Sequence, residues 1–418
     1  MTAPSTADLL RIFGRIGLLS FGGPAAQIAL MHRELVEERP WLTEQQFLSA
    51  LSFCMLLPGP EAMQLATYAG WRLRGTLGGL IAGLLFILPG AAVMLALASL
   101  YATFGAVPLV EAVFLGIKAT VIVIVLRALL KVSKKALTGT VAWVLAGAAF
   151  VAIFVFDVPF PFIIAAAAAV GTIALTGTAQ PAPVIRVSTA QTARTLAIWG
   201  ALWLLPLLGL GVFAPPLLAD VARFFATLAV VTFGGAYAVL AYMVQEVVGT
   251  YGWLTTGQMM DALGLAETTP GPLILVTQFV GFMAGQQEGG WGMGALAALV
   301  TLWVTFTPCF LWIFAGAPYV EWIASRPRLT GALQGITAAV VGVIANLSTW
   351  FALNVWFGDV QRGLFGLWMP DVATINLAAI ALSALAAALL LWREMDLLRV
   401  LAVMAVAGIG FSYAVAGI

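Results

Sequence analysis

The sequence has little of the chemistry that most soluble proteins carry in their active sites and on their surfaces. Only 9% of its 418 residues are charged, against about 25% in an average soluble domain. It holds a single histidine, His32, and two cysteines, Cys54 and Cys309, which lie far apart in apolar segments. Neither metal-ligand spacing nor a redox cysteine pair occurs, so we predict no metal, no cofactor and no enzymatic activity.

A strong net charge is also absent. The formal charge of +1 at pH 7 gives no electrostatic basis for binding nucleic acid. The first residues, MTAPSTADLLRIFGRIG, lack the basic region and the small-residue cleavage site of a secretory signal. We therefore expect this segment to stay on the mature chain.

Apolar residues are what the sequence has in abundance. They make up 62% of the chain, and the mean hydropathy is +1.05. A helix needs roughly 20 apolar residues to cross a bilayer, and hydropathy separates about thirteen apolar segments. These segments are 9–31, 46–70, 76–104, 107–130, 140–156, 159–177, 195–213, 219–247, 259–285, 291–317, 329–352, 373–391 and 397–416. The pattern predicts an all-α polytopic protein embedded in the lipid bilayer.

The distribution of lysine and arginine predicts the orientation. If the segments alternate and the N-terminus is cytoplasmic, the inside loops hold Arg72, Arg74, Arg127, Lys131, Lys134, Lys135, Arg186, Arg194, Arg326, Arg328, Arg393 and Arg399. The outside loops then hold only Arg33, Arg39, Arg223 and Arg362. Because cytoplasmic loops are enriched in positive charge, this bias favours a cytoplasmic N-terminus.

The two halves of the chain contain the same pattern. Residues 20–60 and 232–272 align without a gap at a constant offset of 212. The matched positions are Phe21-Gly22-Gly23 with Phe233-Gly234-Gly235, Glu34 with Glu246, Trp41 with Trp253, and Pro58-Gly59-Pro60 with Pro270-Gly271-Pro272. We expect Glu34 and Glu246 at helix ends beside the membrane surface, where they serve either coupling or a salt bridge.

The repeat suggests a domain organisation. We predict a first repeat at 1–177, a polar linker at 178–194, an extra transmembrane segment at 195–213 and a second repeat at 214–418. An odd number of predicted crossings separates the starts of the repeats, so the copies should be inverted in the membrane. Inverted repeats with broken helices at the midplane are the common build of secondary transporters. A duplicated scaffold without transport is the alternative.

The Pro-Gly-Pro and Phe-Gly-Gly motifs predict interruptions within apolar helices. Proline removes a backbone donor and clashes with the preceding turn, and unsatisfied backbone is tolerated in a membrane only against protein or a water-filled cavity. A half-helix that begins after such a break can face an anion with its N–H groups and positive dipole end. A kinked but continuous spanning helix is the alternative for each motif.

Two acids lie close to these breaks. Glu61 directly follows the first Pro-Gly-Pro, and Glu267 lies three residues before the second. Acids inside membranes are costly and usually mark pathways or proton relays. The alternative is a structural salt bridge, with Arg72 or Arg74 as the partner.

Lys118 is the only lysine in the middle of an apolar segment, and its repeat counterpart is Thr337. Its ammonium group either binds an anionic substrate or pairs internally. The acids considered as partners are Glu61, Glu111 and Glu267.

The stretch SFGGPAAQIALMHRELVEERPWLTEQQFLSALSFCMLLPGPEAMQ and its second copy, FGGAYAVLAYMVQEVV…GWLTTGQMMDALGLAETTPGP, resemble the CHR chromate ion transporter family in its long-chain, two-domain form. The residues that carry the resemblance are Phe21, Gly22, Gly23, Glu34, Trp41, Pro58, Gly59, Pro60, Glu61, Gln64, Phe233, Gly234, Gly235, Glu246, Pro270, Gly271 and Pro272. The resemblance implies a multi-pass protein of the bacterial inner membrane that expels chromate and confers chromate resistance.

A tetrahedral dianion requires donors more than acids. The backbone at the two breaks, the hydroxyls of Thr268 and Thr269, the amides of Gln64 and Gln278, and one cation would supply them. An acid such as Glu61 or Glu267 would oppose the substrate unless it is protonated or paired, which suggests proton coupling or alternating salt bridges.

Several alternatives stay open at the level of sequence. Sulfate or another oxyanion is a substrate alternative to chromate, and a passive anion channel is an alternative to alternating access. A membrane-embedded reductase lacks any cofactor motif. Protons are the coupling ion considered, and a homodimer is compatible with the sequence.

Overall fold

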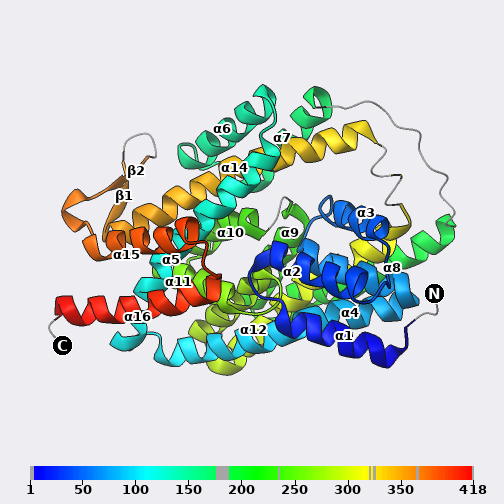
Figure 1. Cartoon of the computed structure of the whole chain (residues 1–418), viewed down its shortest axis with the longest axis horizontal. Coiled ribbons are helices and arrows are strands. Elements are labelled where there is room, and N and C mark those ends of the chain that lie inside the picture. The colour runs from blue at the N-terminus through cyan, green and yellow to red at the C-terminus, as the bar shows by residue number, and fades with distance from the viewer. Residues whose placement is uncertain are drawn as a thin grey trace. The chain divides into compact units, whose positions relative to one another are not determined.

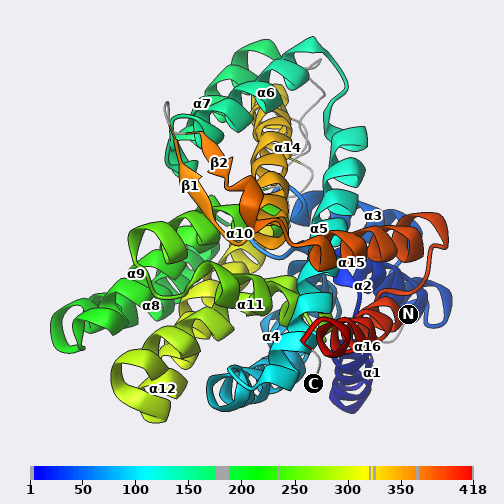
Figure 2. The same ribbon diagram turned by 90° about the vertical axis from the view of Figure 1, so that its left-hand side faces the viewer.

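The chain is almost entirely helical in its computed structural model, which describes residues 4–175, 188–233, 236–319, 322, 326–363 and 367–416 (Figures 1 and 2). The helices of the first half are α1 (Thr6–Leu19), α2 (Gly23–His32), α3 (Glu44–Cys54), α4 (Glu61–Phe104), α5 (Pro108–Ala136), α6 (Thr140–Phe154) and α7 (Phe160–Ala174). Those that follow are α8 (Thr189–Phe213), α9 (Pro216–Val231), α10 (Ala236–Val244), α11 (Thr256–Thr268), α12 (Val276–Gly316), α14 (Pro327–Trp356), α15 (Leu377–Ala387) and α16 (Leu397–Ala416).

Short elements complete the described chain. The π-helical turns are Arg33–Glu37, Gln245–Thr250 and Ala388–Trp392, and the 3₁₀ turns are Leu273–Leu275, Ala317–Tyr319 and Val372–Thr374. Strands β1 (Val360–Arg362) and β2 (Trp368–Pro370) pair antiparallel, with Val360 opposite Pro370. Hydropathy does not predict this hairpin, because each strand is only three residues long.

Six helices in the described chain are long and apolar enough to cross a membrane. They are Glu61–Phe104, Pro108–Ala136, Thr189–Phe213, Leu273–Tyr319, Pro327–Trp356 and Leu397–Ala414. Among the described residues of α8, only Trp203 is buried, while Leu205 and Phe213 are 65% and 89% exposed. An apolar helix surface of this kind suits contact with lipid chains. The prediction of an all-α multi-pass membrane protein is therefore confirmed.

Helices α4 and α12 are each two helices joined by a tight reversal. In α4 the helical dihedrals are lost at Arg74 (φ −143°, ψ 33°) and Gly75 (φ 60°, ψ −154°). In α12 the same pair of conformations occurs at Gly289 (φ −136°, ψ 18°) and Gly290 (φ 72°, ψ −168°). Positive φ favours glycine at the second position of each turn. Each reversal falls between two predicted apolar segments, so the repeat extends beyond the aligned motifs.

The two arms of α4 pack closely after this reversal. A side chain at Gly70 would collide with the carbonyl of Gly78, and one at Gly78 with the carbonyl of Gly70. Small residues allow such close helix packing in membranes. The first arm is therefore a short half-helix that begins after Pro-Gly-Pro and is backed by the long second arm.

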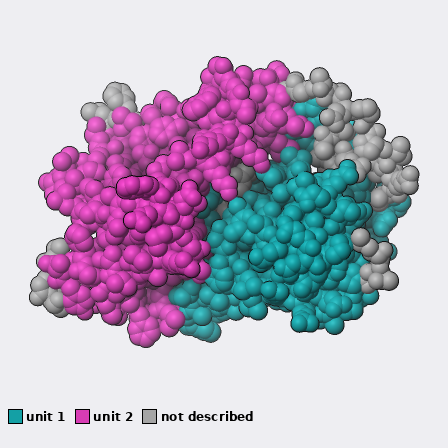
Figure 3. Space-filling model, in the orientation of Figure 1, with its two compact units in different colours: residues 1–99, 177–239, 269–329 teal, residues 100–176, 240–268, 330–418 magenta. Residues whose placement is uncertain are grey.

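The chain divides into two compact units (Figure 3). Unit 1 contains residues 1–99, 177–239 and 269–329, and unit 2 contains 100–176, 240–268 and 330–418. Each unit combines segments from both predicted repeats, so compactness and sequence duplication divide the chain differently. Both copies of Pro-Gly-Pro belong to unit 1, whereas Lys118 belongs to unit 2.

Unit 2 is built around α5. Gly116 of α5 lies against the carbonyl of Met404 on α16, and Gly408 of α16 lies against the carbonyl of Ala112 on α5. Neither glycine leaves room for a side chain, so the two backbones are in direct contact over this stretch. This packing fixes the helix that carries Lys118.

Candidate functional site

The first Phe-Gly-Gly motif interrupts a helix. Helix α1 ends at Leu19 and α2 begins at Gly23, and both Gly22 (φ 84°) and Gly23 (φ 77°) have left-handed backbone. Side chains with a Cβ are strained in this conformation, which explains two consecutive glycines. In the second copy, α9 ends at Val231 and Phe233 follows outside the helix. The predicted site residues Gly234 and Gly235 lie outside the described residues.

An ion pair shows that α1 and α2 fold back on each other. Arg15 Nη1 lies 3.4 Å from Glu34 Oε1, and Arg39 Nη1 lies 2.6 Å from Glu34 Oε2. In a continuous helix Arg15 and Glu34 would be separated by about 28 Å along the axis, too far for their side chains to meet. The alternative of a kinked continuous helix is therefore wrong for this segment. Glu34 is completely buried and paired with both arginines, which favours the salt-bridge interpretation of this acid.

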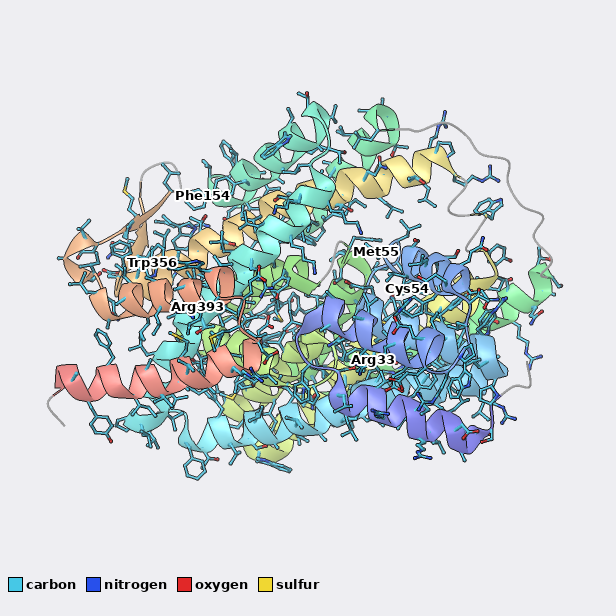
Figure 4. The ribbon with its side chains drawn as sticks, in the orientation of Figure 1. Arg33, Cys54, Met55, Phe154, Trp356 and Arg393 are labelled. Atoms are coloured by element: carbon cyan, nitrogen blue, oxygen red, sulfur yellow. The ribbon has the colours of Figure 1, made fainter. Side chains whose placement is uncertain are left out.

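Both Pro-Gly-Pro motifs interrupt helices as well. The first lies between the end of α3 at Cys54 and the start of α4 at Glu61, and Figure 4 labels Cys54 and Met55 at this end of α3. The second lies between α11 and the turn Leu273–Leu275. Gly59 (φ 112°) and Gly271 (φ 86°) are both left-handed. A Cβ on Gly59 would also lie 2.9 Å from Gln64 Nε2. Both the backbone conformation and the lack of space therefore require glycine at this position.

The breaks of the two repeats are hydrogen-bonded crosswise. The Gly59 N–H donates to the carbonyl of Thr232 at 2.9 Å, and the Gly271 N–H donates to the carbonyl of Ser20 at 2.8 Å. Ser20 and Thr232 occupy the same position in the repeat, immediately before Phe-Gly-Gly. Each Pro-Gly-Pro is thus bound to the Phe-Gly-Gly break of the other repeat, and the two bonds form a symmetric pair within unit 1.

Buried amides satisfy the backbone that the breaks expose. Gln27 Nε2 donates to the carbonyl of Gly271 at 2.7 Å and to that of Ser20 at 3.2 Å. Gln64 Nε2 donates to the carbonyl of Pro58 at 2.7 Å. Both side chains are at most 1% exposed, and the two Pro-Gly-Pro segments are buried. The irregular backbone therefore lies against protein, as the cost of unpaired groups in lipid requires.

The sequence interpretation missed Ser20, Gln27 and Thr232. Gln27 has no amide counterpart, because Val239 occupies its position in the second copy. Ser20 and Thr232 are visible in the aligned repeat as matched hydroxyl residues, which was the available signal. Each hydroxyl donates to a carbonyl one turn back, that of Ile16 or Leu228.

The other predicted residues near the breaks have varied surroundings. Glu61 is half-buried, and Glu267 is 6% exposed. Thr268 Oγ1 donates to the carbonyl of Leu265 at 2.8 Å, and Thr269 is buried. The exposed arginines Arg72 and Arg74 lie at the end of the first arm of α4, where Arg74 donates to the hydroxyl of Thr6. Gln278 Nε2 donates to the carbonyl of Ala91 at 3.1 Å.

Lys118 is paired internally in unit 2. Its Nζ lies 3.0 Å from Asp261 Oδ1, and the Tyr101 hydroxyl donates to Asp261 Oδ2 at 2.7 Å. Asp261 is on α11 and was not among the acids that the sequence suggested as partners. Sequence alone could not select it, because the pairing depends on how α11 packs against α5.

Unit 2 also contains a cavity of about 540 Å³. Its lining includes Asp157, Gln245, Glu246, Asn346, Trp350 and Arg362. Arg362 Nη2 lies 2.9 Å from Asp157 Oδ1, and Gln245 Nε2 donates to the same carboxylate oxygen at 3.2 Å. Glu246 therefore faces a cavity, whereas its repeat counterpart Glu34 is enclosed by two arginines.

Comparison with known proteins agrees with the duplicated architecture. The family described as "Chromate transporter" matches residues 7–172 and 219–411. The chain is 34% identical over 344 residues to "Chromate transport protein" of Pseudomonas aeruginosa, covering 81% of this chain and 79% of the relative.

Two further relatives have similar coverage. "Probable chromate transport protein" of Synechococcus elongatus is 32% identical over 82% of this chain and 84% of its own length. "Chromate transport protein" of Cupriavidus metallidurans is 31% identical over 82% of each. No solved structure matches the chain significantly.

Proposed function

Because the chain belongs to the chromate transporter family, we propose that it exports chromate across the bacterial inner membrane and thereby confers chromate resistance. Family membership establishes a multi-pass membrane protein of a transport family rather than of an enzyme family. The names of the relatives support chromate as the substrate. The N-terminus is cytoplasmic in this proposal.

The crossed pair of helix breaks carries the proposal of alternating access. Two equivalent breaks, joined by Gly59–Thr232 and Gly271–Ser20, form a symmetric centre from which two half-helices start, at Glu61 and at Leu273. Their first turns present the positive end of the helix dipole, which suits an oxyanion. Inverted copies that exchange conformations would open such a centre to one side and then to the other.

The electrical gradient suits export of a dianion. Each elementary charge that crosses the membrane is worth about 2.3 kcal/mol per 100 mV. An inside-negative potential therefore favours outward movement of chromate. A passive anion channel would use the same force, but its flux would not saturate.

Uptake of labelled chromate into inverted membrane vesicles tests the proposal. We expect saturable, protein-dependent uptake that is driven by an inside-positive vesicle potential and inhibited by excess unlabelled chromate. Sulfate as competitor tests selectivity, because it has the same tetrahedral shape and charge. Non-saturating flux would support a channel instead, and no protein-dependent flux of either anion would overturn the proposal.

A further inference from the structure

A charged triad lies within unit 2 around α11. Asp261 is held from two sides, by the Lys118 ammonium at 3.0 Å on Oδ1 and by the Tyr101 hydroxyl at 2.7 Å on Oδ2. The Asp261 side chain is 8% exposed and that of Lys118 is 23% exposed. The acid is therefore enclosed, while part of the lysine side chain is exposed.

The charges of Lys118 and Asp261 depend on each other. An uncompensated charge in a membrane protein interior is strongly unfavourable. If Asp261 loses its negative charge, Lys118 therefore requires another anion as its partner. The remaining acids nearby are Glu111 of α5, whose charge repels that of Asp261, and Glu267, six residues further along α11. Lys118 is the one cation among the charged groups described around Asp261.

Room for a methyl group lies beside the ammonium group, next to Gly257. A Cβ placed on Gly257, in the first turn of α11, would have Lys118 Nζ at 3.8 Å and Thr255 Oγ1 at 3.9 Å as its nearest neighbours. No side chain fills this position. An ammonium group has three donors, and in the described structure it faces Asp261 as an ion pair. Lys118 could therefore bind a second acceptor from this side.

Neither member of the pair recurs in the repeat. Residue 49, the counterpart of Asp261, is a serine, and the counterpart of Lys118 is Thr337. The helix breaks are the shared elements of the two copies, whereas this ion pair occurs in one copy only. Such asymmetry suits a function that a transporter needs once in each cycle.

We propose that Asp261 is a proton-binding site whose protonation releases Lys118 to bind the transported oxyanion. This inference rests on the proposed function. A proton from water adds to Asp261 Oδ1 and breaks the ion pair, while the Tyr101 hydrogen bond stays on Oδ2. The pair then changes from neutral to +1, and a bound dianion brings the total to −1. Release of the anion and loss of the proton restore the Lys118–Asp261 pair.

The sign of this coupling distinguishes the mechanism. The proton strengthens oxyanion binding, and by reciprocity the oxyanion strengthens proton binding. Proton and oxyanion therefore cross in the same direction, with a net charge of −1 for each cycle. An antiporter would require the two ligands to compete.

Calorimetric titration of the purified full-length protein in lipid nanodiscs tests this coupling. Sulfate is titrated in buffers of different ionisation enthalpy at about pH 6 and about pH 8, and chromate at about pH 8, where it is a dianion. We expect the wild-type protein to take up one proton per oxyanion, with an affinity that falls by up to about tenfold per pH unit. Asp261→Asn, a neutral mimic of the protonated acid, should bind without proton uptake and without pH dependence.

Two further variants complete the design. Lys118→Gln should weaken binding by about tenfold or more, because a charged donor is lost, and the double variant K118Q/D261N should do the same without a buried charge. Asp220→Asn, which breaks the exposed Asp220–Arg223 pair, is the matched control and should keep the wild-type pH dependence. Wild-type binding without proton uptake, or an Asp261→Asn protein with unchanged proton uptake, would overturn the inference.

Infrared spectroscopy separates this inference from the proposed function. If neither chromate nor sulfate binds, the proposed function fails, but a carboxylic acid band that titrates in the wild type and is missing in Asp261→Asn would still establish the proton site. Absence of such a band from the wild-type protein would overturn the inference that Asp261 binds a proton.

Discussion

Gly59 in the first repeat and Thr232 in the second are joined by a main-chain hydrogen bond of 2.9 Å. The reciprocal bond joins Gly271 to Ser20 at 2.8 Å. Two motifs that lie about forty residues apart within each copy thus find their partners in the opposite copy. The duplicated motifs thus assemble one centre from two breaks, each of which bonds to the other copy.

Gly59→Ala should destabilise the protein. The left-handed conformation costs a residue with a Cβ about 1–2 kcal/mol, and contact with Gln64 adds to this. Gly14→Ala in α1 is the matched control, because nothing lies within 4 Å of the added methyl group and alanine gains about 0.5–1 kcal/mol in a helix interior. Thermal unfolding in detergent measures both. Equal melting temperatures for the two variants would contradict the required left-handed turn.

Pro58→Ala and Pro270→Ala should impair transport while the protein still inserts into the membrane. Alanine restores an N–H donor and removes the steric bar to a continuous helix, so the break loses its fixed geometry. Vesicle flux normalised to membrane-inserted protein is the measurement. Pro206→Ala in α8 is the control, because this proline lies inside a largely exposed helix. Normal transport by both break variants would mean that the prolines are not needed.

Glu34→Gln should lower the free energy of unfolding by about 1 kcal/mol. The loss is small because the arginine partners of Glu34 are partly exposed. The side chains of Arg15 and Arg39 are 50% and 31% exposed. Glu246→Gln, at the equivalent position, should leave stability nearly unchanged, because this side chain lines a cavity. Unfolding midpoints of the two variants test the contrast, and a larger loss for Glu246→Gln would contradict it.

The free energy of unfolding should fall as the pH rises above 6.5, the ordinary pKa of a histidine. A hydrogen bond to Glu44 at 2.7 Å, with a second to Glu37 at 3.0 Å, raises the pKa of His32 above 6.5. The protonated form is favoured in the folded state, so its contribution is complete below pH 6.5 and is lost as the pH passes the raised pKa. Glu44→Gln removes the main cause and should flatten this part of the stability profile. A profile identical to that of the wild type would exclude the coupling.

The local features of the fold could be predicted from sequence because their causes are local. Proline and glycine at 58–60 and 270–272 interrupt helices through their own backbone chemistry, and the reversals at Gly75 and Gly290 fall between hydropathy segments. The partner of Lys118 could not be predicted in this way. Asp261 lies far along the chain, and only the packing of α11 against α5 brings the two charges together.

Three contacts in unit 1 bear on which segments cross the membrane. They join Thr6 to Arg74, Arg15 to Glu34, and His32 to Glu44. The start of α1 and the end of the first arm of α4 thus meet, as do the end of α2 and the start of α3. With α1 and α2 folded back, we expect the predicted segments 9–31 and 46–70 to enter and leave on the same side. Arg33 and Arg39 then move to the cytoplasmic side, which strengthens the positive bias.

Unit 2 supports the equivalent arrangement in the second copy. Strict alternation places Asp157 outside and the end of the segment 219–247 inside, yet Gln245 donates to Asp157. Thiol labelling in a variant without Cys54 and Cys309 provides the test. Glu38→Cys should be modified from the cytoplasmic side and Thr250→Cys from the opposite side. Alternation of every segment requires the reverse result.

The crossed hydrogen bonds then bear on where the transmembrane voltage falls. If one pair of hairpins enters from each face, Gly59–Thr232 and Gly271–Ser20 mark where their tips meet. Losing two crossings per copy keeps the number between the repeat starts odd, so the inversion is preserved. Most of the transmembrane voltage would then fall across the few residues around these tips. A dianion would pass most of the field in one short displacement, and its rate of movement should depend steeply on voltage.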